Sequence, residues 1–434
     1  MSSSSSSRAP LLLLNPVYAR SKSVIHDELR NFRVFLQWCA LDHSSRAARA
    51  ASYAAFLALA LAVPAAVSLS TRADAGMSPV SASAITFNRV AQIPASGLAV
   101  ISFVALAAFF RRCGGLRQLL FLDGGLRDDT AFVRRGYARE LDRAFRLLAA
   151  LLLPSLCVEA AHKAVFFFAT VRVEPPSPLL PGAAGVPWRA VALVATVASW
   201  VYRTGVFLLV CVLFRLTCEL QILRFEGIYH MFDVEARASA AEIFAEHRRI
   251  RTQLLATSHR YRAFIISCLV TITVSQLSAL LVALSSKDGK SFANSGDLLV
   301  GSSVQLSGFF MCLLGAARIT HRAQRIVSIA SQWHMTMESV HHAKPAATSS
   351  SSASDMDALH PSAGAAPASH QPELGTTAAA CAYRSRHALV TYLSHNSGGI
   401  TLFGFTLDRG LLHTIFAFEM TLVLWILSKF VEFS

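Results

Sequence analysis

Seven long apolar stretches constrain this chain more than any other feature of its sequence. Each holds roughly 20 mainly apolar residues, the length that an α-helix needs to cross a hydrocarbon layer about 30 Å thick. They are Ala48–Ser70, Val90–Phe110, Phe145–Thr170, Ala190–Leu216, Ala263–Leu284, Leu298–Ala317 and Leu411–Phe430. Only 15% of the 434 residues are charged, whereas a soluble protein has about 25%. We therefore predict an all-α, polytopic membrane protein with seven transmembrane helices.

The basic residues predict the orientation of these helices. The segments before the first span and after the second, fourth and sixth spans each contain at least six Lys or Arg, whereas the segments after the first, third and fifth contain two each. Because cytoplasmic loops carry the excess of Lys and Arg, the amino terminus is expected in the cytoplasm and the carboxyl terminus outside. The basic loops then face the anionic leaflet of a lipid bilayer, and no nucleic-acid partner is needed to explain them. The membrane could be the plasma membrane or an internal one.

Composition divides the chain into four parts. Residues 1–23 are expected to form a disordered cytoplasmic tail, and residues 24–342 a membrane domain with spans one to six and cytoplasmic helical extensions. Residues 343–380 are dominated by Ala, Ser and Pro and predict a disordered cytoplasmic insertion. Residues 381–434 hold a helix before the last span, "RHALVTYLSHN", and the last transmembrane helix.

Two cytoplasmic segments show the apolar period of an amphipathic helix. One precedes the fifth span and the other follows the sixth. The apolar positions are Ile243, Ile250, Leu254 and Tyr261 in the first, and Ile319, Ala323, Ile326, Ala330, Trp333, Met337 and Val340 in the second. Each stripe needs to be covered, either within one subunit or between the subunits of an oligomer.

The sequence offers little support for enzyme chemistry. It contains no Gly-x-Gly-x-x-Gly, no Walker loop, no His-Glu-x-x-His and no pair of cysteines at metal-ligand spacing. We accordingly expect no catalytic residues, no metal site and no cofactor.

The last span carries polar residues at helical spacing. At 100° per residue His413, Ala417, Thr421, Leu424 and Ser428 share one face, and a small, polar stripe of this kind suits a pore. Glu419 lies about 120° from His413 and close to the middle of the bilayer. Either a ring of Glu419 carboxylates from several copies favours cations, or Glu419 faces its own bundle and pairs with Arg203 or Lys163.

Three stretches of the chain resemble a known family. They are "LRNFRVFLQWCALDHSS", "FRRCGGLRQLLFLD" with "FVRRGY" after it, and "GGITLFGFTLDRGLLHTIF". These motifs look like the plant family of membrane proteins of unknown function that is related to insect gustatory and odorant receptors. The entry into the last helix, through Gly404, Phe405, Leu407 and Asp408, is similar to that of the insect receptors themselves.

The resemblance implies an insect-chemoreceptor-like fold and a ligand-gated cation channel. Insect relatives assemble as tetramers in which the last helix lines a central pore, so a homo- or hetero-tetramer is expected here. Their ligands occupy a pocket in the outer half of each subunit, which implies an unknown small-molecule ligand. The alternative is a non-conducting membrane receptor, scaffold or structural protein that shares the fold.

By the same analogy, charged and aromatic residues of the third and fourth spans predict a ligand pocket. They are Glu159, His162, Lys163, Trp200 and Tyr202. The simpler interpretation is structural, because Glu159 and Lys163 are four residues apart and can pair on one helix face. That ion pair would tie the third and fourth spans together, with Arg203 as a further partner.

Overall fold

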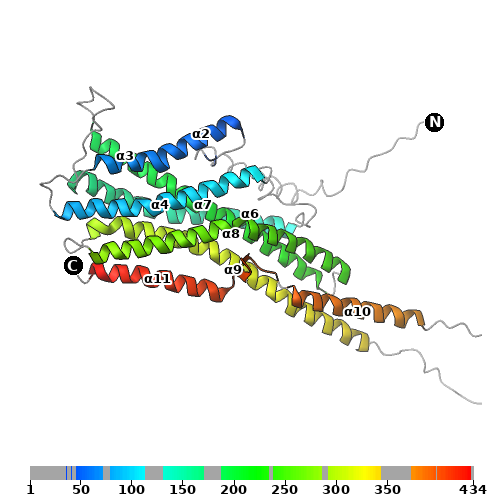
Figure 1. Ribbon diagram of the computed structural model, residues 1–434. Helices are drawn as coiled ribbons and strands as arrows, with labels where there is room; N and C mark the ends of the chain where they lie inside the picture. The colour runs from blue at the N-terminus through cyan, green and yellow to red at the C-terminus, as the bar shows by residue number, and fades with distance from the viewer. Residues whose placement is uncertain are drawn as a thin grey trace, which may run out of the picture.

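The computed structural model describes Leu36, Leu41 and residues 45–71, 79–112, 131–170, 187–233, 238–285, 292–343, 373–396 and 398–431. Within these ranges the chain is almost entirely helical, and seven helices are long and apolar enough to cross a membrane. They lie side by side in one bundle (Figure 1). The predicted all-α, seven-span fold is therefore confirmed. The predicted tail 1–23 and residues 344–372 of the predicted insertion lie outside the described residues.

The first span changes its helical pitch around a proline. It consists of α2 (Arg46–Phe56), the π-helical turn η2 (Leu57–Ala62) and α3 (Val63–Ser70). Pro64 lies at the start of α3. Its ring has no N–H for the carbonyl of Ala60 and would clash with that group in a regular α-helix. The wider turns of η2 just before it accommodate the proline without breaking the span.

The central helix of the bundle is α7. The long helices are α4 (Pro79–Arg112), α6 (Ala131–Val165, followed by the π-turn η4, Phe166–Thr170), α7 (Trp188–Met231), α8 (Ala240–Ser285) and α9 (Phe292–Ala343). Helix α7 packs against α4, α6, α8 and α9. As a result, 94% of its most apolar window is buried, compared with 33% for α8 and 17% for α6. A helix that is apolar all round is expected in such a position.

The two predicted apolar stripes are covered within a single chain, except that Met337 is only partly buried and the side chain of Val340 lies outside the described residues. Helices α8 and α9 continue beyond the apolar windows, and α10 (Glu373–His395) packs along both of them. In Figure 1, α10 and the end of α9 project together from one end of the bundle. The stripe residues that are fully buried in the main core are Ile243, Ile250, Leu254, Tyr261, Ile319, Ala323, Ile326, Ala330 and Trp333. A second subunit is therefore not needed to bury them.

Helix α10 begins earlier than the sequence suggested. The predicted insertion ran to residue 380 and the predicted helix from Arg386, but α10 already begins at Glu373. Its first half is "ELGTTAAACAY", and alanine has the highest helix propensity of all residues. The alanines that read as low complexity thus extend the helix.

A short hairpin connects α10 to the last span. Strands β1 (Thr401–Leu402) and β2 (Phe405–Thr406) pair antiparallel, and α11 (Arg409–Val431) follows. The two turn residues, Phe403 and Gly404, both have positive φ angles of 50° and 92°. Tight two-residue hairpin turns of type I′ need positive φ at both positions.

Candidate functional site

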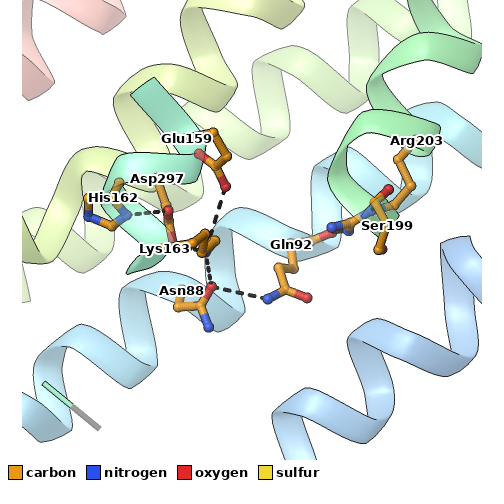
Figure 2. Close-up of polar contacts among 8 residues, drawn as sticks. All are labelled: Asn88, Gln92, Glu159, His162, Lys163, Ser199, Arg203 and Asp297. Carbon is orange, nitrogen blue, oxygen red and sulfur yellow. Dashed lines mark hydrogen bonds and ion pairs between the residues drawn. The ribbon is translucent and has the colours of Figure 1, made fainter. Parts of the chain in front are cut away.

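Polar side chains from four helices meet near the start of α9 and the end of α6 (Figure 2). The other end of α9 is the one that projects with α10 (Figure 1). On the predicted orientation the start of α9 lies in the outer half of the membrane. The group, called the outer polar network below, consists of Asn88 and Gln92 on α4, Glu159, His162 and Lys163 on α6, Ser199 and Arg203 on α7, and Asp297 on α9.

Lys163 is the centre of the network. Its ammonium group donates to Asn88 Oδ1 at 2.7 Å and to Asp297 Oδ2 at 2.5 Å, and it lies 3.7 Å from Glu159 Oε1. The side chains of Lys163 and Asp297 are only 3% and 4% exposed. Water cannot solvate such charges, so they need partners inside the protein. Lys163 therefore ties α4, α6 and α9 together.

His162 contacts the second oxygen of the Asp297 carboxylate. Its Nδ1 lies 2.7 Å from Asp297 Oδ1. The ring fits only because residue 296 is a glycine, since a Cβ atom there would lie 2.6 Å from His162 Cδ2. Asp297 thus accepts contacts from two neighbouring residues of α6, one on each carboxylate oxygen.

Arg203 holds a second branch of the network. Its guanidinium donates to Ser96 Oγ at 2.9 Å and to the carbonyl of Gln92 at 3.3 Å, both on α4. One turn earlier, Ser199 donates to the carbonyl of Leu59 in the π-turn of the first span. The Gln92 amide donates to Asn88 Oδ1 at 3.0 Å and joins this branch to Lys163.

The charges of the network balance. Two cations, Lys163 and Arg203, face two carboxylates, Glu159 and Asp297, and all four are buried. One carboxylate oxygen, Glu159 Oε2, is buried without a hydrogen-bond partner in the described part of the chain.

The structure brings together only part of the predicted ligand pocket. Glu159, His162 and Lys163 lie within one network, as their spacing predicted. Trp200 is buried in the main core, and the ring of Tyr202 lies 6.5 Å from that of Phe56 in the first span. A ligand role for these five residues stays a prediction.

A separate hollow of about 160 Å³ opens between α3, η4 and the start of α7. Its lining is almost wholly apolar, and its floor is formed by Val67 and Phe167. None of the five predicted pocket residues lines it.

The sequence missed Asp297 and Asn88. Asp297 lies one position before the predicted window that begins at Leu298, and Asn88 lies two positions before the window that begins at Val90. Neither was therefore counted as a polar residue inside a span. A search that extended each window by a few residues at its outer end would have found both. Polar residues at the outer ends of two spans can then be matched with buried charges of a third span.

Helix α11 presents one face to its own bundle and one face outward. The predicted stripe of His413, Ala417, Thr421, Leu424 and Ser428 is exposed along its whole length. The opposite face is buried against α8 and α9 and includes Leu412, Leu422 and Ile426. An exposed histidine on an otherwise apolar span needs water or another polar surface beside it, whereas the hydroxyls of Thr421 and Ser428 donate to carbonyls of their own helix.

Glu419 belongs to the buried face. It is fully buried, and its Oε1 is hydrogen-bonded to the hydroxyl of Thr273 on α8. The predicted pairing with Arg203 or Lys163 is wrong, because both cations are engaged in the outer polar network. On a helical wheel Glu419 lies opposite Ser428, so the two no longer compete for one side of the helix. A carboxylate ring at a pore would need Glu419 on the exposed side.

The comparisons with known proteins agree with this fold. Residues 27–418 match the family described as "Protein of unknown function (DUF3537)". The chain belongs to this family. No curated protein matches the DUF3537 chain.

Two solved structures share the architecture of the DUF3537 chain. The insect olfactory receptor OR5 from Machilis hrabei is 12% identical and superposes with a TM-score of 0.50, covering 92% of this chain and 98% of that chain. The same receptor in complex with eugenol is also 12% identical with a TM-score of 0.50, and covers 95% and 99%. At this identity the likeness establishes the fold, which is that of an insect olfactory receptor.

Proposed function

We propose that this chain is a subunit of a ligand-gated cation channel in which α11 from several copies surrounds the pore. The observation that carries the proposal is the exposed stripe of α11. A single chain leaves His413, Thr421 and Ser428 facing outward in the last span, whereas lipid-facing positions of a span are normally apolar. Surrounding an aqueous axis with this face would solvate these groups.

The hydroxyl groups of the stripe suit cation passage. Thr421 and Ser428 donate to carbonyls of their own helix at 2.7 and 2.8 Å. Both hydroxyl protons are therefore engaged in hydrogen bonds, and the oxygen lone pairs remain free to accept from water or to contact a cation. Ala417, one turn before Thr421, has a small side chain and leaves room for a hydrated path.

The fold supports a small molecule as the gating ligand. The related OR5 structure was solved in complex with eugenol. We propose that a small molecule acts here through the outer polar network, at Glu159, His162 and Lys163, with Trp200 and Tyr202 contributing the aromatic surface. Because the network is filled by its own side chains, binding would require Lys163 or His162 to exchange a contact for the ligand.

A flux assay on the purified, reconstituted protein tests the pore without knowledge of the ligand. Proteoliposomes are loaded with K⁺, and dissipation of the K⁺ gradient is measured after a cationic methanethiosulfonate reagent is added. The T421C variant is expected to lose its basal flux on modification. The matched control is L422C, the next residue, whose side chain is only 7% exposed.

Two results would overturn the proposal. One is a well-folded, reconstituted protein that gives no K⁺ flux in any variant, which supports the alternative of a non-conducting receptor or scaffold. The other is a flux that survives modification of T421C and of a second exposed position, S428C. In that case the ions pass elsewhere.

A further inference from the structure

The hairpin before α11 is held firmly at its base. The two glycines that lead into it press against α9, where an added Cβ would lie 3.2 Å from Ala323 Cβ at Gly398 and 3.1 Å from Thr320 Oγ1 at Gly399. The backbone N–H of Thr401 donates to Ser258 Oγ on α8 at 3.3 Å. The hairpin is thus a fixed projection of the bundle.

The tip of this projection carries two aromatic side chains. Phe403 is 68% exposed and Phe405 is 75% exposed. Phe403 also adopts a φ of 50°, a left-handed conformation that is unfavourable for a residue with a Cβ atom. Asparagine or glycine would fit this turn position better. The fold therefore keeps large apolar groups at a place where neither packing nor turn geometry favours them.

The tip lies at the boundary between the cytoplasmic extensions and the membrane. Ser258 and Arg262, its contacts on α8, come just before the apolar window that begins at Ala263. On the other side, α11 begins at Arg409 and becomes apolar at Leu411. The positive-inside pattern assigns this boundary to the inner leaflet.

The charge around the tip is positive. The Arg262 guanidinium lies 5.2 Å from the centroid of the Phe403 ring, and Arg409 is exposed at the foot of the hairpin. The acidic neighbour, Asp408, is engaged locally, because its Oδ1 accepts the backbone N–H of Leu411 at 2.7 Å and caps α11. Aromatic rings with adjacent cations are the chemistry that binds the interfacial region of an anionic leaflet.

We propose that the hairpin tip is a lipid-binding surface, in which Phe403 and Phe405 insert at the level of the inner-leaflet headgroups. Arg262 and Arg409 pair there with anionic phosphate or carboxylate groups of the lipids. The tip thereby fixes the depth at which α11 enters the bilayer. The inference requires only the predicted orientation and does not depend on channel activity.

Photocrosslinking in the full-length protein tests whether lipid contacts the hairpin tip. A benzophenone analogue of phenylalanine replaces Phe403 or Phe405, and the protein is reconstituted in phosphatidylcholine vesicles with or without phosphatidylserine. Irradiation is expected to give lipid adducts at both positions, detected by mass spectrometry. Phosphatidylserine should be over-represented in the adducts by about fivefold for each arginine that contacts it. The control position is Phe214, which is fully buried.

The other outcomes overturn the proposal. Covalent dimers of the chain would show that the tip faces a second copy, and the absence of any adduct would place it in water. Adducts that contain phosphatidylserine only at its proportion in the vesicle would exclude the headgroup pairing. The R262Q/R409Q double variant is expected to abolish the phosphatidylserine preference while the adducts themselves persist.

Discussion

The hydroxyl of Thr273 contacts two oxygen atoms at once, the carbonyl of Leu269 at 3.0 Å and the carboxyl group of Glu419. A threonine hydroxyl has one proton, so it can donate to only one of them. Both hydrogen bonds form together when the Glu419 carboxyl carries a proton and donates to Thr273. No cation forms an ion pair with Glu419 in the described part of the chain, and its Oε2 is buried there without a partner. A protonated Glu419 makes this pair a neutral link between α8 and α11.

This link predicts that the E419Q variant folds and assembles normally. The glutamine amide can donate to Thr273 as the carboxylic acid does, and no opposite charge is left orphaned. The E419K variant, which buries a cation against a hydroxyl, is expected to lose the monodisperse peak in size-exclusion chromatography. If E419Q aggregates like E419K, Glu419 is ionised and has a cationic partner that the structure does not show.

The ion pair between Lys163 and Asp297 predicts strong non-additivity. Removing one partner, in K163M or D297N, leaves the network with one unbalanced buried charge and should cost about 3–5 kcal/mol. The K163M/D297N double variant removes both charges and should recover most of the loss. Thermal denaturation of the four proteins in detergent, followed by the intensity of the monodisperse peak, measures this coupling. Additive losses would mean that the two side chains act independently.

The glycine beside His162 predicts a local steric effect. In G296A the new methyl group would lie 2.6 Å from His162 Cδ2, so the ring must leave Asp297, and we expect a loss of about 1–3 kcal/mol. The matched control is G301A on the same helix, where the Cβ would lie 3.8 Å from Gln305 Nε2, an ordinary contact. The H162A/G296A double variant should regain stability relative to G296A. Equal melting temperatures for G296A and G301A would contradict the contact.

The charge pattern of the loops predicts the side of the membrane on which the chain ends. An epitope tag after Ser434 on a surface-targeted protein should bind antibody without permeabilisation, and a tag before Met1 only after it. An internal control is a tag placed after Ala366, in the Ala-, Ser- and Pro-rich segment that the sequence assigns to the cytoplasm. Reversed accessibility would contradict the predicted orientation and, with it, the inner-leaflet position of the hairpin.

Properties that are local along the chain were predictable from the sequence. The seven spans follow from apolar length, and the pairing of Glu159 with Lys163 follows from a separation of one helical turn, which the structure gives as 3.7 Å. The third partner, Asp297, is 134 positions from Lys163, and no local pattern connects them. Glu419 was misjudged for a related reason. A search for opposite charges finds only cations, whereas its partner is the uncharged hydroxyl of Thr273.

Helix α7 has a mechanical consequence for the whole molecule. It runs for 44 residues, about 65 Å, with no proline in its interior, whereas α4 and α6 each contain one. About a third of the way along, Arg203 is fixed to α4, and near the far end the hydroxyl of Tyr229 donates to the backbone carbonyl of Arg322 on α9. A helix that is enclosed by its neighbours and has no interior proline is expected to bend less than a kinked one. A shift of Arg203 is therefore expected to reach Tyr229 along the helix axis, which would couple the outer polar network to the opposite end of α7.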